Sequence, residues 1–505
     1  MPIVHDWLAR RASLAPERVA LIDSLRGGRR ISWREWNAAA HRTALLLLDL
    51  GVTPGRRVSV LAYNGVETLD LLFACAKLGA ALQPLNWRLG VTELRGLLAD
   101  VEPQAVFFGP EFRSQVDALR PLLPRVLHWI PLADPLPGER SFASRDDLPA
   151  SRALPVIDVE PDSPWVLCST GGSTGLPKSA VLTHGSLTAN AANTVVSWGL
   201  TQDDVALLNA PLFHTGGLNV FTLPLVYVGG ASVVCRGFDV EQAFDLIHSG
   251  SVSVVFGVPT MFIEMQRHPR FDAVDFSRLK LLISGGAPCP APVFERFFSR
   301  YLFFRTGYGL TEAGPNNFFL PAHAVRSHPG FVGVPLFHVE ARIDGEQRPG
   351  DVGELLLRGP HLCAGYWRNP EETARAFVEG WLHTGDLASR DAAGFFRIEG
   401  RRKDLIISGG ENIHPSEVES VLAGHPDVAE VAVIGVPDPK WGEVPRALIV
   451  PRPGTAPTLP ALQAFCEGRL ARYKLPRTLR LLTALPRTPA GKVDRRALGL
   501  SHGLD

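Results

Sequence analysis

Short apolar runs alternate with helix-type patterns along most of this chain, and that alternation restricts its fold more than any other feature. The pattern predicts a strand at Arg57–Ala62, a helix at Val66–Lys77 and a second strand at Ala105–Gly109. Such alternation favours parallel, doubly wound sheets with helices on both faces. We therefore predict two α/β subdomains, over about residues 1–160 and 161–330. The second has candidate strands at Trp165–Cys168, Asp204–Pro211, Ala231–Val234, Val252–Val258 and Leu279–Ser284.

The pattern changes after about residue 330. Short apolar pieces broken by Gly and Pro, such as Val352–Arg358, predict a small β barrel or meander over residues 331–400. This β-rich subdomain would complete an N-terminal domain of residues 1–400. Residues 401–505 have the size of a unit that can fold alone. We expect a compact α+β domain there, with helices at Pro415–Ala423 and Leu459–Leu470 and strands at Val428–Val436 and Pro445–Val450.

The composition points to a small-molecule partner. Lys plus Arg and Asp plus Glu are both 51, so the formal net charge is zero and nothing global favours nucleic acid or anionic lipid. Six scattered cysteines include no CxxC pair, which argues against a disulfide framework or structural zinc and favours the cytoplasm. Residues 1–11 lack the apolar region of a secretory signal. Polar residues, prolines and glycines interrupt the charge-free stretch Val205–Cys235, so no membrane span is expected.

The segment Ser169–Lys178 carries the strongest chemical signal. Its sequence is Ser-Thr-Gly-Gly-Ser-Thr-Gly-Leu-Pro-Lys, after a predicted strand and before a helix that begins near Gly185. Glycines let backbone N–H groups turn toward an anion, while hydroxyls and a lysine add donors and positive charge. It is not a Walker A loop, because Pro177 stands where that motif has Gly. Taken alone, the segment is a phosphate loop or a flexible Ser/Gly surface loop.

Further motifs follow this segment along the chain, namely Pro211–His214, Ser284–Pro288, Tyr308–Glu312, Trp381–Asp386, Gly400–Asp404 and Pro486–Lys492. This ordered set resembles the adenylate-forming superfamily over nearly the whole chain, and specifically its acyl-CoA synthetase branch. That superfamily also includes aryl-CoA synthetases, peptide-synthetase adenylation domains and firefly luciferase. The resemblance implies that ATP, Mg²⁺ and coenzyme A are used and that the small C-terminal domain is mobile.

The resemblance also assigns roles to individual residues of the nucleotide site. Tyr308 would stack on adenine, Asp386 would bind the ribose hydroxyls, and Arg401 would contact ribose or phosphate. Thr311 would donate to the α-phosphate, and Glu312, together with Thr174, would hold Mg²⁺. Without the family resemblance, Tyr308 would be interpreted as a core residue, Asp386 as a turn residue and Arg401 as a surface residue. The Thr311-Glu312 pair would be interpreted as a helix start. The other implied nucleotide or thiol contacts are Thr170, Gly172, Ser173, Gly175, Lys178, Gly285, Gly286, Ala287, Pro288, Thr306, Gly307, Gly309, Gly409 and Gly410.

Three more residues are tied to the two steps of the reaction. Lys492 resembles the lysine that bridges the carboxylate and the α-phosphate, and Lys403 resembles the hinge on which the C-terminal domain turns. His214 would stand beside the acyl carboxylate as gate or positioner, although a lone His in an apolar stretch is more often structural. Departures from the family pattern are Gly171, Ser179 and Ile407.

The carboxylic acid is less well defined by the sequence. Amino-acid-activating relatives place an acidic residue after the Phe of the region where this chain has Phe213 and His214, so a neutral acid is favoured. Gly216 and Gly217 with apolar neighbours suit a fatty chain or an aromatic ring, and we favour a fatty acid. Alternatives are an aryl-CoA ligase, a ligase that loads a carrier protein, a luciferase-like oxygenase and an inactive binding protein. The pattern allows a homodimer.

Overall fold

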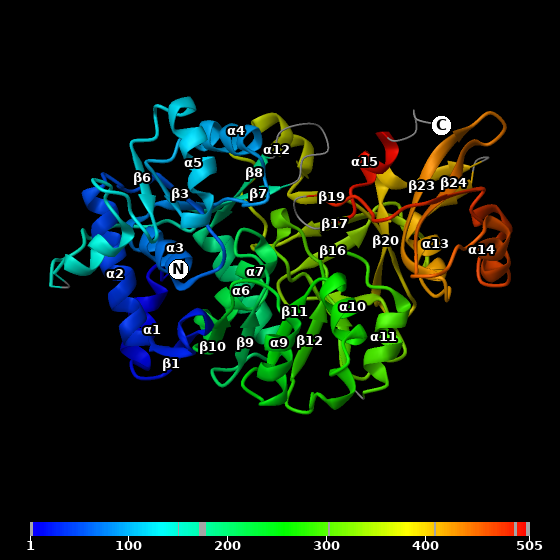
Figure 1. Ribbon diagram of the computed structural model, residues 1–505, viewed down its shortest axis with the longest axis horizontal. Helices are drawn as coiled ribbons and strands as arrows, with labels where there is room; N and C mark the ends of the chain where they lie inside the picture. The colour runs from blue at the N-terminus through cyan, green and yellow to red at the C-terminus, as the bar shows by residue number, and fades with distance from the viewer. Residues whose placement is uncertain are drawn as a thin grey trace.

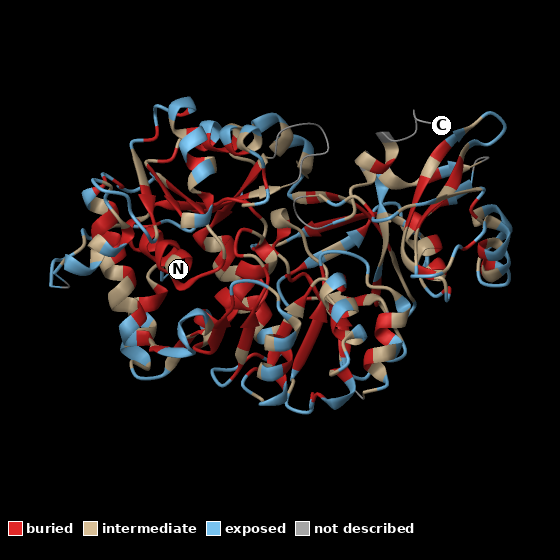
Figure 2. Ribbon diagram, viewed as in Figure 1, coloured by how far each residue is buried: buried red, intermediate tan, exposed pale blue. Residues whose placement is uncertain are grey.

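The computed structural model describes residues 4–149, 151–170, 178–300, 303–408, 411–488 and 492–500. Within these residues the chain forms three sheets in a large N-terminal part and one in a smaller part that ends the chain (Figure 1). Buried strands fill the interior of the large part, and exposed loops surround them (Figure 2). The predicted α/β fold class is confirmed.

The first sheet has the strand order β6-β5-β3-β4-β7-β8 and is parallel except for β8. The predicted strand–helix–strand succession is present here as β3, α3 and β5. Its strands are β3 (Arg57–Leu61), β4 (Ala81–Pro84), β5 (Ala105–Phe108), β6 (His128–Pro131), β7 (Pro164–Thr170) and β8 (Lys178–Thr183). The helices of this region are α1 (Trp7–Leu14), α2 (Trp33–Asp49), α3 (Val66–Leu78), α4 (Val91–Val101) and α5 (Arg113–Leu119).

The second sheet has the order β13-β12-β11-β9-β10-β1-β2 and is parallel from β13 to β1. The two sheets exchange strands: β1 and β2, which precede the first sheet in sequence, belong to the second sheet, whereas β7 belongs to the first. The candidate strand Trp165–Cys168, expected in the second subdomain, is therefore a strand of the first sheet. The subdomain boundary at residue 160 stays a prediction. Strands are β1 (Val19–Asp23), β2 (Arg29–Ser32), β9 (Val205–Leu208), β10 (Ala231–Val234), β11 (Val254–Gly257), β12 (Leu281–Ser284) and β13 (Phe304–Thr306). Helices are α6 (His184–Trp198), α7 (Thr215–Asn219), α8 (Thr222–Val228), α9 (Val240–His248), α10 (Pro259–Arg267) and α11 (Ala291–Phe298).

The third sheet is antiparallel, in line with the Gly- and Pro-broken pattern of this region. Its order is β14-β15-β20-β19-β17-β16, and β18 pairs with β19. The elements are β14 (Phe318–Phe319), β15 (Phe331–Pro335), β16 (Glu340–Ile343), β17 (Gly353–Arg358), α12 (Pro370–Ala376), β18 (Phe377–Val378), β19 (Trp381–Arg390) and β20 (Phe396–Arg401).

The C-terminal part begins after β20 and is built around the order β22-β21-β24-β23, with β25 beside β24. The long hairpin of β23 and β24 forms its core with α13 and α14. The predicted helix at Leu459–Leu470 ends earlier, at Cys466. The elements are β21 (Ile406–Ser408), β22 (Glu411–Ile413), α13 (Pro415–Leu422), β23 (Val428–Asp438), β24 (Gly442–Pro451), α14 (Leu459–Cys466), β25 (Thr478–Leu481) and α15 (Arg495–Leu500). Among the helices of the described residues, none combines the length and apolar character that crossing a membrane would need.

Helix α3 is buried on nearly all sides, which places polar side chains inside the N-terminal part. Asp70 has no exposed surface, and its Oδ2 accepts a hydrogen bond from Arg145 Nη1 at 2.5 Å. Burial raises the pKa of Asp70 to about 6, and the Arg145 charge opposes that rise. Arg145 therefore compensates a carboxylate that would otherwise be buried alone.

We predict that Arg145→Met destabilises the protein by about 3–5 kcal/mol at neutral pH, since it leaves the buried Asp70 charge uncompensated. The loss should shrink near pH 5, because a carboxyl whose folded pKa is raised takes up a proton as the pH falls through about 6. Denaturant unfolding at both pH values measures this. Arg34→Met, which breaks the exposed pair with Glu17, is the control and should cost less than about 1 kcal/mol. An equal loss at both pH values would contradict the prediction.

Candidate active site

The predicted site residues gather at one edge of the second sheet. The strands β9, β11, β12 and β13 are parallel, so their carboxyl ends share an edge, which is where open α/β sheets bind ligands. His214 follows β9, Gly285 follows β12 and Tyr308 follows β13. The predicted strand Asp204–Pro211 in fact ends at Leu208, and Asn209–Pro211 lead out of the sheet toward His214.

The third sheet contributes two further residues to this edge. Asp386 in β19 lies opposite Arg401 at the end of β20, and its Oδ1 is 2.8 Å from Arg401 Nε. Tyr308 donates from its hydroxyl to Asp386 Oδ2 at 2.6 Å. Burial raises the pKa of Asp386, whereas Arg401, Tyr308 and Lys492 lower it. Three residues predicted for adenine, ribose and phosphate are thus connected across two sheets.

Lys492 enters the same site from the C-terminal part. The bridge between Arg487 and Val493 and the hydrogen bond from Thr488 N to Lys492 O (2.7 Å) hold its backbone in a hairpin. The Lys492 side chain reaches solvent, but protein atoms lie around it. The resulting partial desolvation lowers the pKa of the ammonium, and the positive charge of Arg401 lowers it further. Asp386 and Glu312 act in the opposite direction. The Lys492 ammonium therefore stands within electrostatic range of both predicted carboxylates.

His214 stands at the start of α7 as a neutral imidazole. Its Nε2 is buried and has no hydrogen-bond partner among the described residues. Burial lowers its pKa to about 4, and the positive charges of Lys492 and Arg88 contribute. A buried polar atom without a protein partner at the edge of a site is available to a ligand. The structure therefore places His214 at the carboxyl edge of the second sheet, and its role beside the acyl carboxylate stays a prediction.

Phe256, near the end of β11, packs against two glycines at this edge of the sheet. A Cβ added to Gly216 would lie 3.0 Å from Phe256 Cε1, and one added to Gly285 would lie 3.1 Å from Cε2. The ring therefore fills the space between these two glycines, and side chains there would displace it. A small pocket adjoins the ring on the side of α7 and α8, lined by residues that include Ala206, Asn209 and Phe221.

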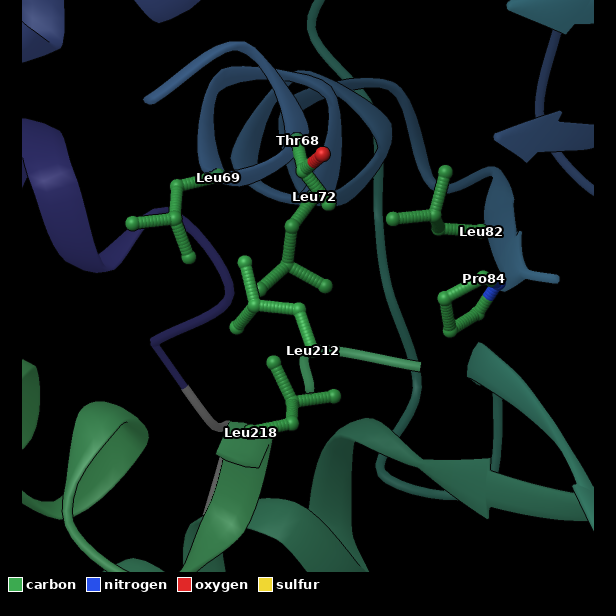
Figure 3. Close-up of a pocket in the computed structure, with 7 residues that line it drawn as sticks. All are labelled: Thr68, Leu69, Leu72, Leu82, Pro84, Leu212 and Leu218. Atoms are coloured by element: carbon green, nitrogen blue, oxygen red, sulfur yellow. The ribbon is translucent and has the colours of Figure 1, made fainter. Parts of the chain in front are cut away.

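A small, separate apolar cavity backs Leu212 of the Pro211–His214 motif (Figure 3). Leu212, in the loop after β9, and Leu218, in α7, line one side of it, and residues of α3 and β4 line the other. Thr68 contributes the hydroxyl drawn at its edge. This lining does not suit a charged ligand, so the cavity marks where the two sheets pack behind the site.

Tyr366 contacts both Glu312 and Lys178, the residues predicted for Mg²⁺ and phosphate. The Glu312 carboxylate accepts a hydrogen bond from Tyr366 at 2.8 Å, and the Tyr366 ring centroid lies 5.6 Å from the Lys178 ammonium, which forms an ion pair with Glu372. Mg²⁺ is bound in nucleotide enzymes by one or two carboxylates plus phosphate oxygens. Within the described residues no group of three or more potential metal ligands gathers. A single carboxylate such as Glu312 fits a Mg²⁺ that arrives bound to substrate phosphates.

The remaining predicted site residues divide into those that the structure describes and those that lie outside the described residues. Thr170 ends β7 opposite Lys178, Thr311 and Glu312 share the short helix Thr311–Ala313, and Thr306 Oγ1 is buried without a partner among the described residues. Gly286, Ala287 and Pro288 follow Gly285 at the edge, and Gly307 and Gly309 flank Tyr308. The predicted Gly172, Ser173, Thr174, Gly175, Gly409 and Gly410 lie outside the described residues.

The predicted hinge lies between two anchored neighbours. On one side, Arg402 Nη1 is 2.9 Å from Oε2 of the buried Glu354. On the other, Asp404 Oδ2 is 3.6 Å from Arg495 Nε of the C-terminal part. Lys403 between them is exposed. The linkage is therefore tied to the N-terminal part before Lys403 and to the C-terminal part after it.

Sequence reasoning missed Phe256, Tyr366 and Glu372. Phe256 is one more apolar residue in a strand pattern, and its role follows only from the glycines of two other segments. Tyr366 lies in the segment Gly365–Tyr366–Trp367, and Glu372 lies in the first turn of α12. In the sequence, a Glu that follows Asn369-Pro370 predicts only the start of a helix.

Comparison with known proteins accounts for this arrangement. Residues 8–367 match the family model of the AMP-binding enzymes, and residues 417–492 match the AMP-binding enzyme C-terminal domain. A feruloyl-CoA synthase from Amycolatopsis sp is 41% identical over 97% of this chain and 96% of its own length. An indoleacetate–CoA ligase from Aromatoleum aromaticum is 37% identical over 97% and 96%.

Two further proteins extend the comparison. A long-chain-fatty-acid–CoA ligase, FadD13, from Mycobacterium tuberculosis is 34% identical over 97% of both chains. The crystal structure of ATP-bound MatB from Rhodopseudomonas palustris superimposes with a TM-score of 0.89, 31% identity and 99% coverage of both chains. These matches span the whole architecture, including the domain that carries Lys492. The resemblance noted in the sequence is confirmed, and the chain belongs to the AMP-binding enzyme family.

Proposed function

We propose that this protein joins an aromatic carboxylic acid to coenzyme A through an acyl adenylate. It is an AMP-forming acid–CoA ligase that uses ATP, Mg²⁺ and coenzyme A. The choice of acid rests on one observation: the Phe256 ring packs against the bare backbones of Gly216 and Gly285 and lines the adjoining pocket. The ring occupies the space that side chains at these two positions would take, so Phe256 itself, rather than the glycines, offers the flat aromatic wall that suits a planar ring. Relatives that act on ferulate and indoleacetate agree with this choice.

In the first step the substrate carboxylate attacks the α-phosphorus of ATP. An O–P bond forms, the bond to the bridging oxygen of the β-phosphate breaks, and pyrophosphate leaves. Glu312, together with the predicted ligand Thr174, would hold Mg²⁺, which when bound would supply positive charge to the phosphates. Lys492 offers positive charge to the carboxylate and the α-phosphate as negative charge grows between them. Tyr308, Asp386 and Arg401 hold the nucleoside in place.

In the second step the thiol of coenzyme A attacks the acyl carbon. A C–S bond forms, the thiol proton goes to solvent, and AMP leaves. We extend the proposal to a rotation about Lys403, which would withdraw Lys492 and bring Gly409 and Gly410 toward the thiol. His214, uncharged, orients the acid and then the incoming thiol. The cytoplasmic location and the homodimer stay predictions.

A fatty acid, the substrate favoured in the sequence analysis, is the second candidate. The long-chain-fatty-acid ligase relative supports it, and so does the space beyond Phe256. A chain would have to displace the Phe256 ring to enter that space. A pyrophosphate-release screen over aryl, fatty and amino acids, with and without coenzyme A, separates these candidates. If no acid releases pyrophosphate from ATP, the proposed function falls.

We predict that Lys492→Ala lowers formation of the acyl adenylate by about 10²–10³-fold, because the developing charge loses its cation. Pyrophosphate release in the absence of coenzyme A measures this step. Lys440→Ala, at an exposed lysine of the same domain, should leave it unchanged. The assignment of Lys492 is wrong if adenylate formation persists and only transfer to the thiol fails.

A second prediction concerns pH. Because burial lowers the His214 pKa to about 4, the imidazole gains a proton only as the pH falls through about 4 and stays neutral at higher pH. His214→Asn should lower kcat/KM by about 10-fold or more through lost positioning, by the same factor from about pH 6 to 9. Paired pH profiles test it. A wild-type inflection near pH 6.5 that the variant lacks would contradict it.

A third prediction concerns the acid. Wild-type kcat/KM for ferulate or indoleacetate should exceed that for decanoate by at least about 10-fold. Phe256→Ala removes the wall and should reduce that preference by about 10-fold or more, by admitting alkyl chains to the adjoining space. Competition assays with paired acids give the ratios directly, and Phe256→Leu should be intermediate. A wild-type preference for decanoate would favour the fatty-acid candidate instead.

A further inference from the structure

The segment Cys363–Thr373 connects the strand of the phosphate loop to the predicted Mg²⁺ ligand. Cys363 N donates to the backbone oxygen of Glu312 at 2.8 Å. Two residues later, Gly365 O accepts a hydrogen bond from Val181 N of β8 at 2.9 Å. These backbone bonds fix the segment between β8 and the short helix that carries Glu312. Side chains of the segment are therefore held against both Lys178 and Glu312.

Two of those side chains meet Lys178 and Glu312 directly. Tyr366 donates its hydroxyl to Glu312 Oε1 at 2.8 Å, and its ring centroid lies 5.6 Å from the Lys178 ammonium. Glu372, in the first turn of α12, forms an ion pair with Lys178. In this arrangement a protein carboxylate holds the ammonium that the phosphate loop would offer to ATP.

The ion pair between Lys178 and Glu372 is partly shielded from solvent, which strengthens the attraction between the two charges. The Lys178 and Glu372 side chains are 22% and 28% exposed, so water and salt screen their attraction less than they screen a surface pair. The Lys178 contact is also the main reason that the pKa of Glu372 is lowered. Glu372 is thus ionised at neutral pH and competes with any other anion for Lys178.

This inference rests on the proposed function and on the phosphate contact that the family resemblance implies for Lys178: we propose that Glu372 is a resident counter-ion that the terminal phosphates of ATP displace. Binding of ATP exchanges one anion for another at Lys178, so part of the attraction to phosphate is offset by the lost ion pair. When pyrophosphate leaves, the carboxylate returns to the ammonium. Glu372 therefore weakens nucleotide and pyrophosphate binding and favours product release.

The test measures ligand affinity rather than turnover. Glu372→Gln keeps the side chain's shape and removes its charge, so the Kd for MgATP and for inorganic pyrophosphate should fall about 3- to 10-fold by titration calorimetry. The matched control is Glu371→Gln. Glu372 is also paired with Arg375, whose Nη1 lies 2.5 Å from Glu372 Oε1. Glu371 lies on the same helix, is 83% exposed and contacts Arg375 as well, at 3.8 Å, but lies outside the Lys178 pair. The control should bind both ligands as the wild type does.

A double-mutant cycle shows whether Glu372 acts through Lys178. In a Lys178→Met background, Glu372→Gln should no longer change either Kd. Unchanged or weaker binding in Glu372→Gln, or tightening that persists without Lys178, would overturn the inference. A different result marks failure of the proposed function: wild-type protein that binds neither MgATP nor pyrophosphate. Thermal melting of each variant confirms that it is folded.

Discussion

Parallel pairing among β9, β11, β12 and β13 determines where the active site can lie. Because these strands run in one direction, each loop that follows one of them begins at the same edge of the sheet. His214, Gly285 and Tyr308 therefore lie at one edge. The third sheet must then approach that edge to complete the nucleoside contacts. The hydrogen bond between Tyr308 and Asp386 is where the two sheets join in the site.

Charge balance links this edge to the C-terminal part. Asp386 and Glu312 are carboxylates of the N-terminal part, and Arg401 partly compensates the first of them. Lys492 is attracted by both carboxylates and repelled by Arg401. A triphosphate would add negative charge between these cations and relieve the repulsion. On the proposed function, a bound nucleotide would therefore stabilise the orientation of the C-terminal part described here.

The sequence predicted local elements and motif positions well, because both depend on residues close together in the chain. β3, α3 and β5 follow from periodicity, and His214, Asp386 and Lys492 follow from ordered motifs. Strand exchange between the first two sheets could not be predicted, since nothing near β1 specifies β10 as its partner. Phe256 and Glu372 were missed for the same reason. Their roles depend on Gly216, Gly285 and Lys178, which reach them only through tertiary packing.

The strand exchange also affects how the chain can fold as it is made. Leu21 of β1 pairs with Ser232 of β10, while β7 and β8 complete the first sheet from residues in between. The hairpin of β1 and β2 therefore emerges early from the ribosome but finds its sheet only after β10 has been synthesised. Until then it has an unpaired edge. With this topology the first 160 residues cannot form a stable core by themselves early in synthesis. The N-terminal core is completed only when the second sheet forms.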